Sequence, residues 1–408
     1  MKIVLIDKEE RQKIGGLIVY SERFYNYFKK HGHEVVILRF SRNNPKQKYI
    51  FKLPYYLAEP RSFIFLPTEQ TLNILRNYLE KIKPDIVYTS NGLSPLDFFL
   101  PSVCHQLKIP VAGIWHADFN YGLSSYQLLI KSIFLAYLPF CRQLDLLHVF
   151  SQKLADFYIH KGISRKNILI LPNSVNDNIY KPGSSEFAKI HGIKTGILFL
   201  GRLTLQKNPE ILIKSFLSLN PPIDTKLILV GMGDQENYLK ENYHDKRIIF
   251  TGAITDENRK LDVMRACRIF VLPSRFEGMP LALLEAMSTG LACIASDAGS
   301  NSELLQDAGI IISSTKLKQE LPIALKICID NPGLTEILGE KARKKILKEF
   351  SQQLIFDRLT KAFENTIAKY KVSGTTLSKP VQLDEAIFRK LKSIWKDVKK
   401  FGSYLDSV

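Results

Sequence analysis

Two glutamates stand in unusual surroundings in the stretch SRFEGMPLALLEAMSTG, residues 274–290. Glu277 lies in a turn with glycine and proline, and Glu285 lies inside an otherwise apolar run that is typical of a helix. A carboxylate buried without a partner costs several kcal/mol. Because carboxylate oxygens accept hydrogen bonds from vicinal diols, we expect a ligand rich in hydroxyl groups to meet these two side chains.

The turn between the two glutamates is suited to an anion. Pro280 favours the first turn of a helix, and the free N–H groups and dipole of a helix N-terminus attract negative charge. We therefore expect a phosphate to lie against the residues of this turn, with Glu277 directed past it towards hydroxyl groups and Glu285 about one turn further along the helix. The predicted phosphate-binding residues are Gly278, Met279, Pro280 and Leu281.

Two cations follow another strand-like run. The segment FLGRLTLQKNPE (199–210) contains Arg202 and Lys207, which suit a diphosphate, since arginine grips an anion bidentately. Either cation alone is more often a solvated surface residue. Glycine turns follow two other runs: one lies in LILVGMGD (227–234), and the other contains Gly15 and Gly16. Such glycines permit close backbone approach to a phosphate or sugar, although a simple turn is the plainer interpretation.

The elements that must position these residues form two series. Short apolar runs alternate with amphipathic stretches, a pattern that predicts parallel sheets covered by helices. The first series is KIVLI (2–6), EVVIL (34–38), DIVYTS (85–90), VAGIWH (111–116), LLHVFS (146–151) and ILILPN (168–173); the second is GILFLG (196–201), KLILVG (226–231), RIIFTG (247–252), IFVLP (269–273), ACIAS (292–296) and GIIIS (309–313). We predict two Rossmann-like α/β domains, 1–183 and 184–365. A ligand is then expected between them, because such sheets bind ligands at the carboxyl ends of their strands.

The remaining residues, 366–408, are expected to form helices that pack back on the N-terminal domain. KVSGTTLSKP (371–380) has the composition of a linker. After it, Ile387, Leu391, Ile394, Trp395 and Val398 fall at helical spacing among lysines, which predicts a basic amphipathic helix. This tail could pack on the core or lie on a membrane surface.

Composition narrows the class of protein. The chain has 408 residues, a formal net charge of +17 and an apolar fraction of 45%, typical of a globular protein of two to three domains. Its five cysteines are scattered without metal-ligand spacing, which favours reduced thiols in the cytoplasm. No signal peptide or membrane span is predicted. A strong positive charge suits phosphorylated ligands, nucleic acid or an anionic membrane, or serves solubility alone.

Taken in order, these segments resemble the retaining, nucleotide-sugar-dependent glycosyltransferases of family 4, which have the GT-B fold. The resemblance covers essentially residues 1–370. Its most specific part is the E-x7-E motif, met by Glu277 and Glu285, and GRLTLQKN matches a G-R-x4-K element. KPDIVYTS, LPNSVNDNIYKP and HGHEVVIL also stand in the family's order. The usual N-G-V-D element, however, reads Asn173-Ser174-Val175-Asn176.

The resemblance implies a role for each matching residue. Arg202 and Lys207 would neutralise the leaving diphosphate, Glu285 would hold the ribose, and Glu277 the hydroxyls of the donor sugar. His116 in GIWHADF matches a histidine that approaches the sugar from the N-terminal domain, and Asp118 could orient it or the acceptor. No DxD motif is present, so no metal or other cofactor is expected. The two cations and the helix N-terminus would supply the positive charge that a metal ion would otherwise provide. The donor is expected to be a UDP-sugar, with GDP left open.

The acceptor is expected to bind the N-terminal domain. Residues 38–67 hold six cations against one acid, with seven aromatic residues between them. This mixture suits an anionic bilayer, stacked nucleic-acid bases or an ordinary solvated loop. An apolar helix is predicted within 116–141, and WHADFNY resembles enzymes that glycosylate diacylglycerol lipids. We therefore expect a membrane lipid or glycolipid, such as a glycosyldiacylglycerol, as acceptor, and a peripheral location on the cytoplasmic face of a membrane.

Other functions stay open at this stage. A polysaccharide or capsule intermediate is the main competing acceptor. A nucleotide-sugar epimerase would need further acid and base residues that the sequence does not reveal. A non-catalytic nucleotide-binding or nucleic-acid module would explain the charge, but not the joint presence of Arg202, Lys207, Glu277 and Glu285. No nucleic-acid partner is therefore expected.

Overall fold

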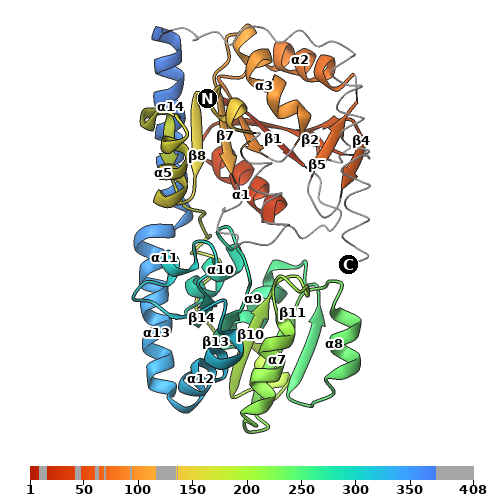
Figure 1. Cartoon of the computed structure of the whole chain (residues 1–408), viewed down its shortest axis with the longest axis vertical. Helices are drawn as coiled ribbons and strands as arrows, with labels where there is room; N and C mark the ends of the chain where they lie inside the picture. Colours follow the sequence, from red (N-terminus) through yellow and green to blue (C-terminus); the bar gives the residue numbers. More distant parts are fainter. Residues whose placement is uncertain are drawn as a thin grey trace.

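The computed structural model describes residues 1–8, 16–41, 47–59, 64–68, 70–91, 94–115, 135 and 137–373. Two α/β domains lie one above the other along the long axis of the molecule (Figure 1). Gly15, His116, Asp118, most of the expected apolar helix at 116–141 and the amphipathic tail lie outside the described residues.

The N-terminal sheet consists, in the described part of the chain, of seven parallel strands in the order β3-β2-β1-β6-β7-β8-β9. Its strands read as nearly continuous apolar runs because a parallel sheet is covered on both faces. They are β1 (Lys2–Lys8), β2 (Glu34–Phe40), β3 (Ile50–Leu53), β6 (Ile86–Asn91), β7 (Val111–Trp115), β8 (Leu146–Val149) and β9 (Ile168–Ile170). Around it lie α1 (Gly16–Lys30), α2 (Thr71–Ile82), α3 (Pro95–Gln106), α5 (Gln152–His160) and the short η1 (Arg165–Asn167).

The C-terminal sheet has six parallel strands among the described residues, in the order β12-β11-β10-β13-β14-β15. They are β10 (Thr195–Leu200), β11 (Thr225–Val230), β12 (Ile248–Gly252), β13 (Ile269–Leu272), β14 (Ala292–Ser296) and β15 (Ile310–Ile312). The helices are α6 (Glu186–Ile190), α7 (Pro209–Ser218), α8 (Glu236–Asn242), α9 (Glu257–Arg265), α10 (Leu281–Thr289), α11 (Asn301–Leu305), α12 (Leu317–Asp330) and α13 (Pro332–Lys345). Each expected strand segment contains a strand, and the prediction of two Rossmann-like domains is confirmed.

The basic, aromatic segment 38–67 is not simply a loop. It contains β3, which extends the N-terminal sheet, and the antiparallel pair β4 (Tyr55–Glu59) and β5 (Ile64–Pro67). Four of its aromatic side chains pack within the domain: Phe40 is buried in the core, Tyr55 packs against that core, Tyr49 stacks on Tyr25 at 3.6 Å, and Phe51 lies 5.3 Å from Tyr78. Part of the aromatic content that suggested a membrane surface therefore serves internal packing.

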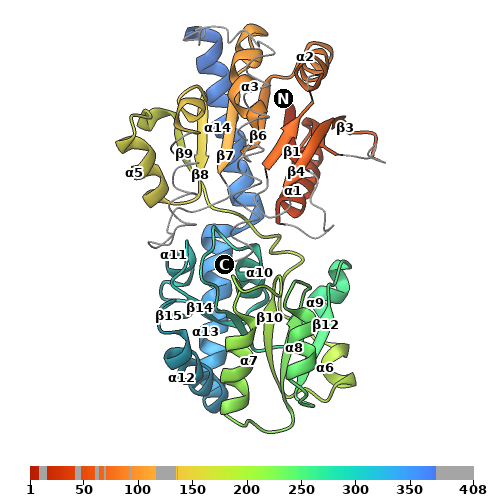
Figure 2. The same ribbon diagram turned by 45° about the vertical axis from the view of Figure 1, so that its right-hand side comes forward.

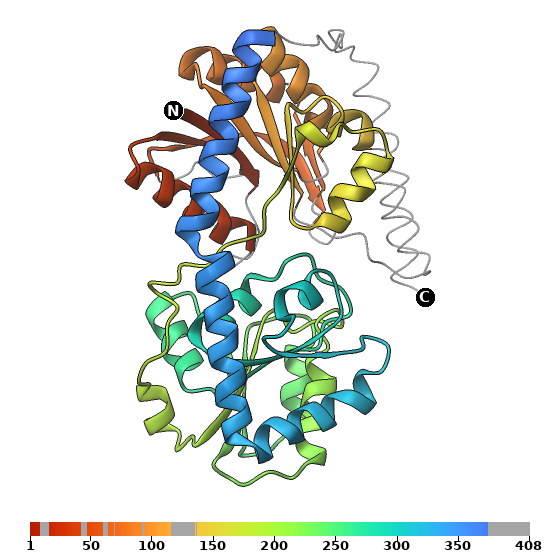
Figure 3. The same ribbon diagram turned by 90° about the vertical axis from the view of Figure 1, so that its left-hand side faces the viewer.

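The chain crosses between the domains twice, and the two crossings lie side by side. Val175 N donates to Phe350 O at 3.1 Å, and Gln352 N donates to Val175 O at 2.9 Å. The second crossing follows α13 and the π-helical turn η2 (Ile346–Phe350), and Ser351 is extended. Helix α14 (Gln352–Ser373), which spans the expected boundary at residue 365, then runs along the N-terminal domain (Figure 3). Its Phe356 and Phe363 pack on the Phe24 ring of α1.

A buried chain of hydrogen bonds ties the first crossing to the N-terminal sheet. His148 Nε2 lies 2.7 Å from Leu171 O, which can only accept, so Nε2 carries the proton and Nδ1 accepts from Tyr88 Oη at 2.7 Å. The Tyr88 oxygen in turn accepts from Tyr20 Oη at 3.0 Å. Burial lowers the pKa of His148 to about 4, although the bond to Leu171 opposes that shift.

No helix among the described residues is both long enough and apolar enough to cross a bilayer.

Candidate functional site

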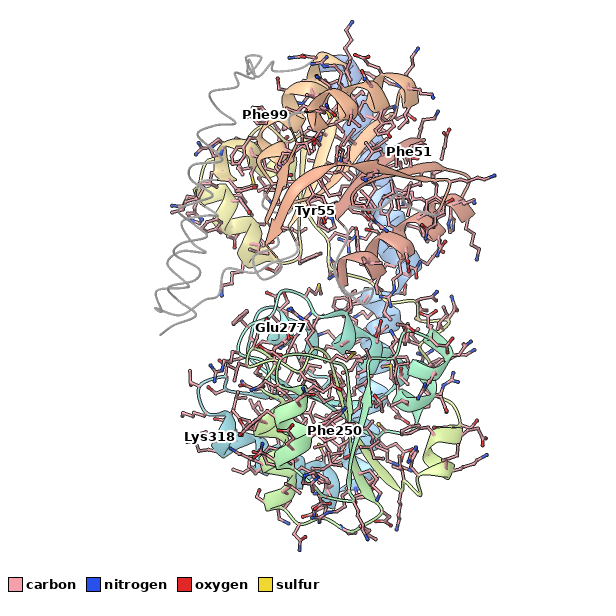
Figure 4. The ribbon with its side chains drawn as sticks, turned by 90° about the vertical axis from the view of Figure 1, so that its right-hand side faces the viewer. Phe51, Tyr55, Phe99, Phe250, Glu277 and Lys318 are labelled. Carbon is pink, nitrogen blue, oxygen red and sulfur yellow. The ribbon has the colours of Figure 1, made fainter. Side chains whose placement is uncertain are left out.

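The loops at the carboxyl edge of the C-terminal sheet face the N-terminal domain, as the position of Glu277 in Figure 4 shows. Several hydrogen bonds fasten the loop after β10 to the loop after β13, among them the following three. Gln206 Nε2 donates to Phe276 O at 3.0 Å, Arg275 N donates to Gln206 O at 2.8 Å, and Asn208 Nδ2 donates to Pro273 O at 3.1 Å. Arg202, Lys207 and Glu277 thus belong to one interlocked surface.

Glycines allow these loops to touch through their backbones. A Cβ on Gly231 would lie 1.9 Å from Gly201 O, and one on Gly233 would lie 2.2 Å from Leu203 O. Gly231 also has a φ of +143°, which other residues rarely adopt. The strand, glycine turn and helix expected at 227–241 are confirmed. Loop-to-loop packing already requires glycine there, and the approach of a ligand to this turn stays a prediction.

Lys207 and Glu277 form an ion pair between the loops after β10 and β13. Their side chains are 15% and 7% exposed, so the pair is partly shielded from water. Arg202 is exposed, and within the described residues its side chain has no hydrogen-bond or ion-pair partner. The Arg202 guanidinium is therefore available to an anion, whereas Lys207 is held in place by the carboxylate beside it.

Helix α10 begins at this surface. Pro280 is its N-cap residue rather than its first helical residue, and no side chain caps the first turn. Among the described residues, no side chain accepts from the N–H groups of the first turn. The helix lies at the domain edge that faces α1 (Figures 1 and 2), and its first turn follows Glu277 closely in the chain. These N–H groups favour an anion, and so does the positive charge of Arg202, which belongs to the loop after β10 at the same edge of the sheet. Gly278, Met279 and Leu281 lie where the sequence predicts them, in and beside this turn.

Glu285 is buried, but it does not lack partners within the protein. Its Oε1 accepts from Arg23 Nη2 of α1 at 2.6 Å, and its Oε2 accepts from Lys260 Nζ of α9 at 3.1 Å. Burial raises the pKa of the carboxyl, yet the charges of Lys260 and Arg23 outweigh burial and hold the pKa below its usual range. The partners that we expected only from a ligand are thus supplied by two cations, and the contact to ribose stays a prediction.

Sequence reasoning missed both cations. Arg23 is 262 residues away from Glu285 in the chain. Its segment, 13–24, was singled out for Gly15 and Gly16 and not for the arginine, and Lys260 stands in no segment that was singled out. The only available signal was Glu285 itself, whose burial requires positive charge or donors nearby.

The departure from the N-G-V-D element is accommodated in the first crossing. Asn173 Nδ2 donates to Met279 O at 3.0 Å, which fastens the crossing to the turn before α10. Asn176 Oδ1 accepts from Asn178 N at 3.3 Å, so the amide oxygen caps a turn in the place of an aspartate oxygen. Ser174 and Val175 make their contacts through the backbone.

Several predicted site residues cannot be placed. Gly15, His116 and Asp118 lie outside the described residues, and Gly16 opens α1 as its first residue. In the part of the chain that the structure describes, no three His, Cys, Asp or Glu side chains come together as a metal-binding group. Independence from metal stays a prediction.

An open hollow of about 330 Å³ lies at the opposite, amino edge of the C-terminal sheet. Arg265 and Arg343 line it, but Arg265 Nε donates to Lys181 O at 3.0 Å and Arg343 Nη1 donates to Tyr180 O at 3.0 Å. These arginines fasten the inter-domain crossing to the C-terminal domain. The carboxyl edge, with its cations, carboxylates and helix N-terminus, is the better candidate site.

Comparisons with known proteins agree with this geometry. Residues 14–178 match a family model described as Glycosyltransferase Family 4, and residues 194–331 match one described as Glycosyl transferases group 1. The UDP-Gal:alpha-D-GlcNAc-diphosphoundecaprenol alpha-1,3-galactosyltransferase of Escherichia coli is 32% identical over 200 residues, which are 45% of this chain and 50% of that enzyme. The chain thus matches about half the length of this relative.

A second relative and one solved structure match over more of the chain. Sulfoquinovosyl transferase SQD2 of Arabidopsis thaliana is 23% identical over 354 residues, which are 81% of this chain and 67% of that protein. The structure of Anabaena HepE in complex with UDP-glucose superposes with a TM-score of 0.71 at 16% identity, covering 90% of this chain and all of that one. The two family models follow the two observed domains in order, and the chain belongs to the family 4 glycosyltransferases, with the GT-B fold.

Proposed function

We propose that this enzyme transfers a sugar, with retention at the anomeric carbon, from a UDP-sugar to a hydroxyl group of a membrane lipid or lipid-linked sugar. The observation that carries the proposal is the gathering of Arg202, the Lys207–Glu277 pair and the N-terminus of α10 on the face that meets the N-terminal domain. Positive charge and unpaired N–H groups suit a departing diphosphate, and the carboxylate beside them suits sugar hydroxyls.

The protein's contribution to the reaction would be electrostatic. The bond between the anomeric carbon and the diphosphate oxygen breaks, and the diphosphate carries away the electron pair. The acceptor oxygen bonds to the same face of the sugar, and its proton passes to the departing diphosphate oxygen. Arg202, Lys207 and the α10 amides stabilise the charge that develops on the diphosphate; Lys207 and the amides are already held in place by the Lys207–Glu277 pair and the helix. Glu277 orients Lys207 and remains within reach of the donor sugar.

Two relatives support a UDP-sugar as donor. The name of the Escherichia coli enzyme includes UDP-Gal, and HepE is complexed with UDP-glucose. The same Escherichia coli name includes a diphosphoundecaprenol acceptor, which is a sugar on a polyprenyl lipid. A lipid acceptor is also consistent with the basic segment 38–67, even though Tyr49 and Phe51 are used in packing.

The test is a panel of UDP-, GDP- and ADP-sugars incubated with diacylglycerol, a glycosyldiacylglycerol or a polyprenyl-diphosphate sugar in anionic vesicles. Mass spectrometry identifies the product, and NMR gives its anomeric configuration. We expect transfer from a UDP-sugar to one of the lipids with retention, and co-flotation of the protein with the vesicles. Transfer only to water-soluble saccharides would contradict the lipid acceptor, and an inverted product would contradict the mechanism.

A further inference from the structure

The Arg23–Glu285 ion pair joins the two domains at the candidate donor site. Arg23 belongs to α1, on the edge of the N-terminal domain nearest the other domain, and Glu285 belongs to α10, on the facing edge (Figures 1 and 2). The side chains are only 11% and 5% exposed. Among the described residues, this ion pair joins the N-terminal domain to the C-terminal domain, and its Glu285 belongs to the E-x7-E motif.

The guanidinium of Arg23 is held from three sides. Nη2 donates to Glu285 Oε1 at 2.6 Å, Nη1 donates to Ser174 O of the first crossing at 3.3 Å, and the group lies 5.6 Å from the centre of the Tyr180 ring. Lys260 lies 4.9 Å from the same ring and holds the other oxygen of Glu285. The position of Arg23 therefore depends on the N-terminal domain, the crossing and α10 at once.

In this arrangement the Glu285 carboxylate can still accept further hydrogen bonds. A carboxylate offers about four lone-pair positions, and Arg23 and Lys260 occupy one on each oxygen. One position per oxygen remains, and a vicinal diol donates two hydrogen bonds. The two cations keep the group ionised despite burial, and they restrict its rotation by holding both oxygens.

We propose that Arg23 is a positioning residue of the donor site: it orients the Glu285 carboxylate from the opposite domain, so that the nucleotide's ribose diol binds tightly only when the two domains are closed. This inference rests on the proposed function and deepens it, because it makes the N-terminal domain a contributor to donor binding. The partner is the cis-diol of a ribonucleotide. Arg23 itself does not touch the reacting atoms, so it acts on donor affinity and domain closure rather than on the chemical step.

The test compares Arg23→Gln and Arg23→Lys with Lys30→Gln, a matched control that removes one exposed charge from the same helix. UDP affinity is measured by calorimetry and donor KM and kcat by initial rates. Closure is measured as a distance between spin labels on Glu80→Cys and Lys318→Cys, one exposed site in each domain; the five native cysteines are buried. Arg23→Gln should weaken UDP binding and raise donor KM about tenfold, while kcat stays within about twofold of the wild-type value. Without nucleotide, the distance between the two spin labels should be longer than in the protein with Arg23.

Arg23→Lys should recover part of the affinity, because a lysine can keep the bond to Glu285 but not the bond to Ser174. Lys30→Gln should resemble the wild type. Unchanged or tighter UDP binding by Arg23→Gln, alongside normal binding by the wild type, would overturn this inference and leave the proposed function standing. If the wild type bound no nucleotide at all, the proposed function would fail and this inference with it.

Discussion

At the scale of single residues, the role proposed for Lys207 of the Lys207–Glu277 pair gives the most specific prediction. Lys207→Met keeps the length of the side chain and removes its charge. If Lys207 stabilises the departing diphosphate, kcat at saturating donor should fall at least tenfold, as for other single partners of transition-state charge. Lys189→Met is a suitable control, since it breaks an exposed pair with Glu186 in the same domain and should change kcat little. A Lys207→Met enzyme with folded spectra and near wild-type kcat would contradict this role.

The two glutamates also show how much of the candidate site could be predicted from the sequence. Their spacing and the two cations after β10 predicted one surface, and Lys207 and Glu277 do meet there. Arg23 could not have been found in the same way. An ion pair formed between distant helices leaves no local pattern, and only the folded arrangement of the two domains brings the two side chains together.

At the scale of elements, α13 contains a matched pair of glycines. A Cβ on Gly339 would lie 2.1 Å from Gly290 O, at the end of α10, whereas a Cβ on Gly333 meets nothing within 4 Å. Gly339→Ala should therefore destabilise the protein by about 2 kcal/mol or more through displaced backbone. Gly333→Ala should be neutral or stabilise by about 0.5–1 kcal/mol. Denaturant titration measures both, and equal effects would contradict the close packing of α13 on α10.

The hydrogen-bonded chain through His148 predicts a pH dependence. The folded state has a His148 pKa of about 4, whereas an unfolded histidine has a value of about 6.5. Between these values the unfolded state binds the extra proton, so stability falls as the pH drops through this window, by up to roughly 3 kcal/mol. His148→Gln cannot titrate and should lose less stability from pH 6.5 to 4. The free energy of unfolding of both proteins is measured across that range. An equal loss in the wild type and in His148→Gln would refute the prediction.

The strands show why sequence patterns succeeded in some places and failed in others. Buried parallel strands such as β1 and β10 each contain four consecutive apolar residues, Ile3–Ile6 and Ile197–Leu200. A run of this length next to turn residues favours a buried strand. Strands β3 and β4 are short and carry lysine or tyrosine at partly exposed positions, so composition suggested a surface segment instead. Their pairing with β2 and β5 is a tertiary contact that local propensity does not encode.

At the scale of the whole molecule, the two crossings form a narrow connection between domains that otherwise have their own sheets. Val175 pairs with Ser351, where the chain is extended between η2 and α14. Changes in a few backbone angles there could alter the angle between the domains. Donor binding on one domain and acceptor binding on the other would then be coupled through closure, with Arg23 and Glu285 meeting at the boundary.

The central claim is that the nucleotide binds the carboxyl edge of the C-terminal sheet. Hydrogen–deuterium exchange with and without UDP tests it most directly, because it locates binding along the chain. We predict slower exchange in residues 201–208, 231–235 and 277–284, with no change at the opposite edge in residues 333–343. Protection confined to that opposite edge, or no protection anywhere at saturating UDP, would contradict the account.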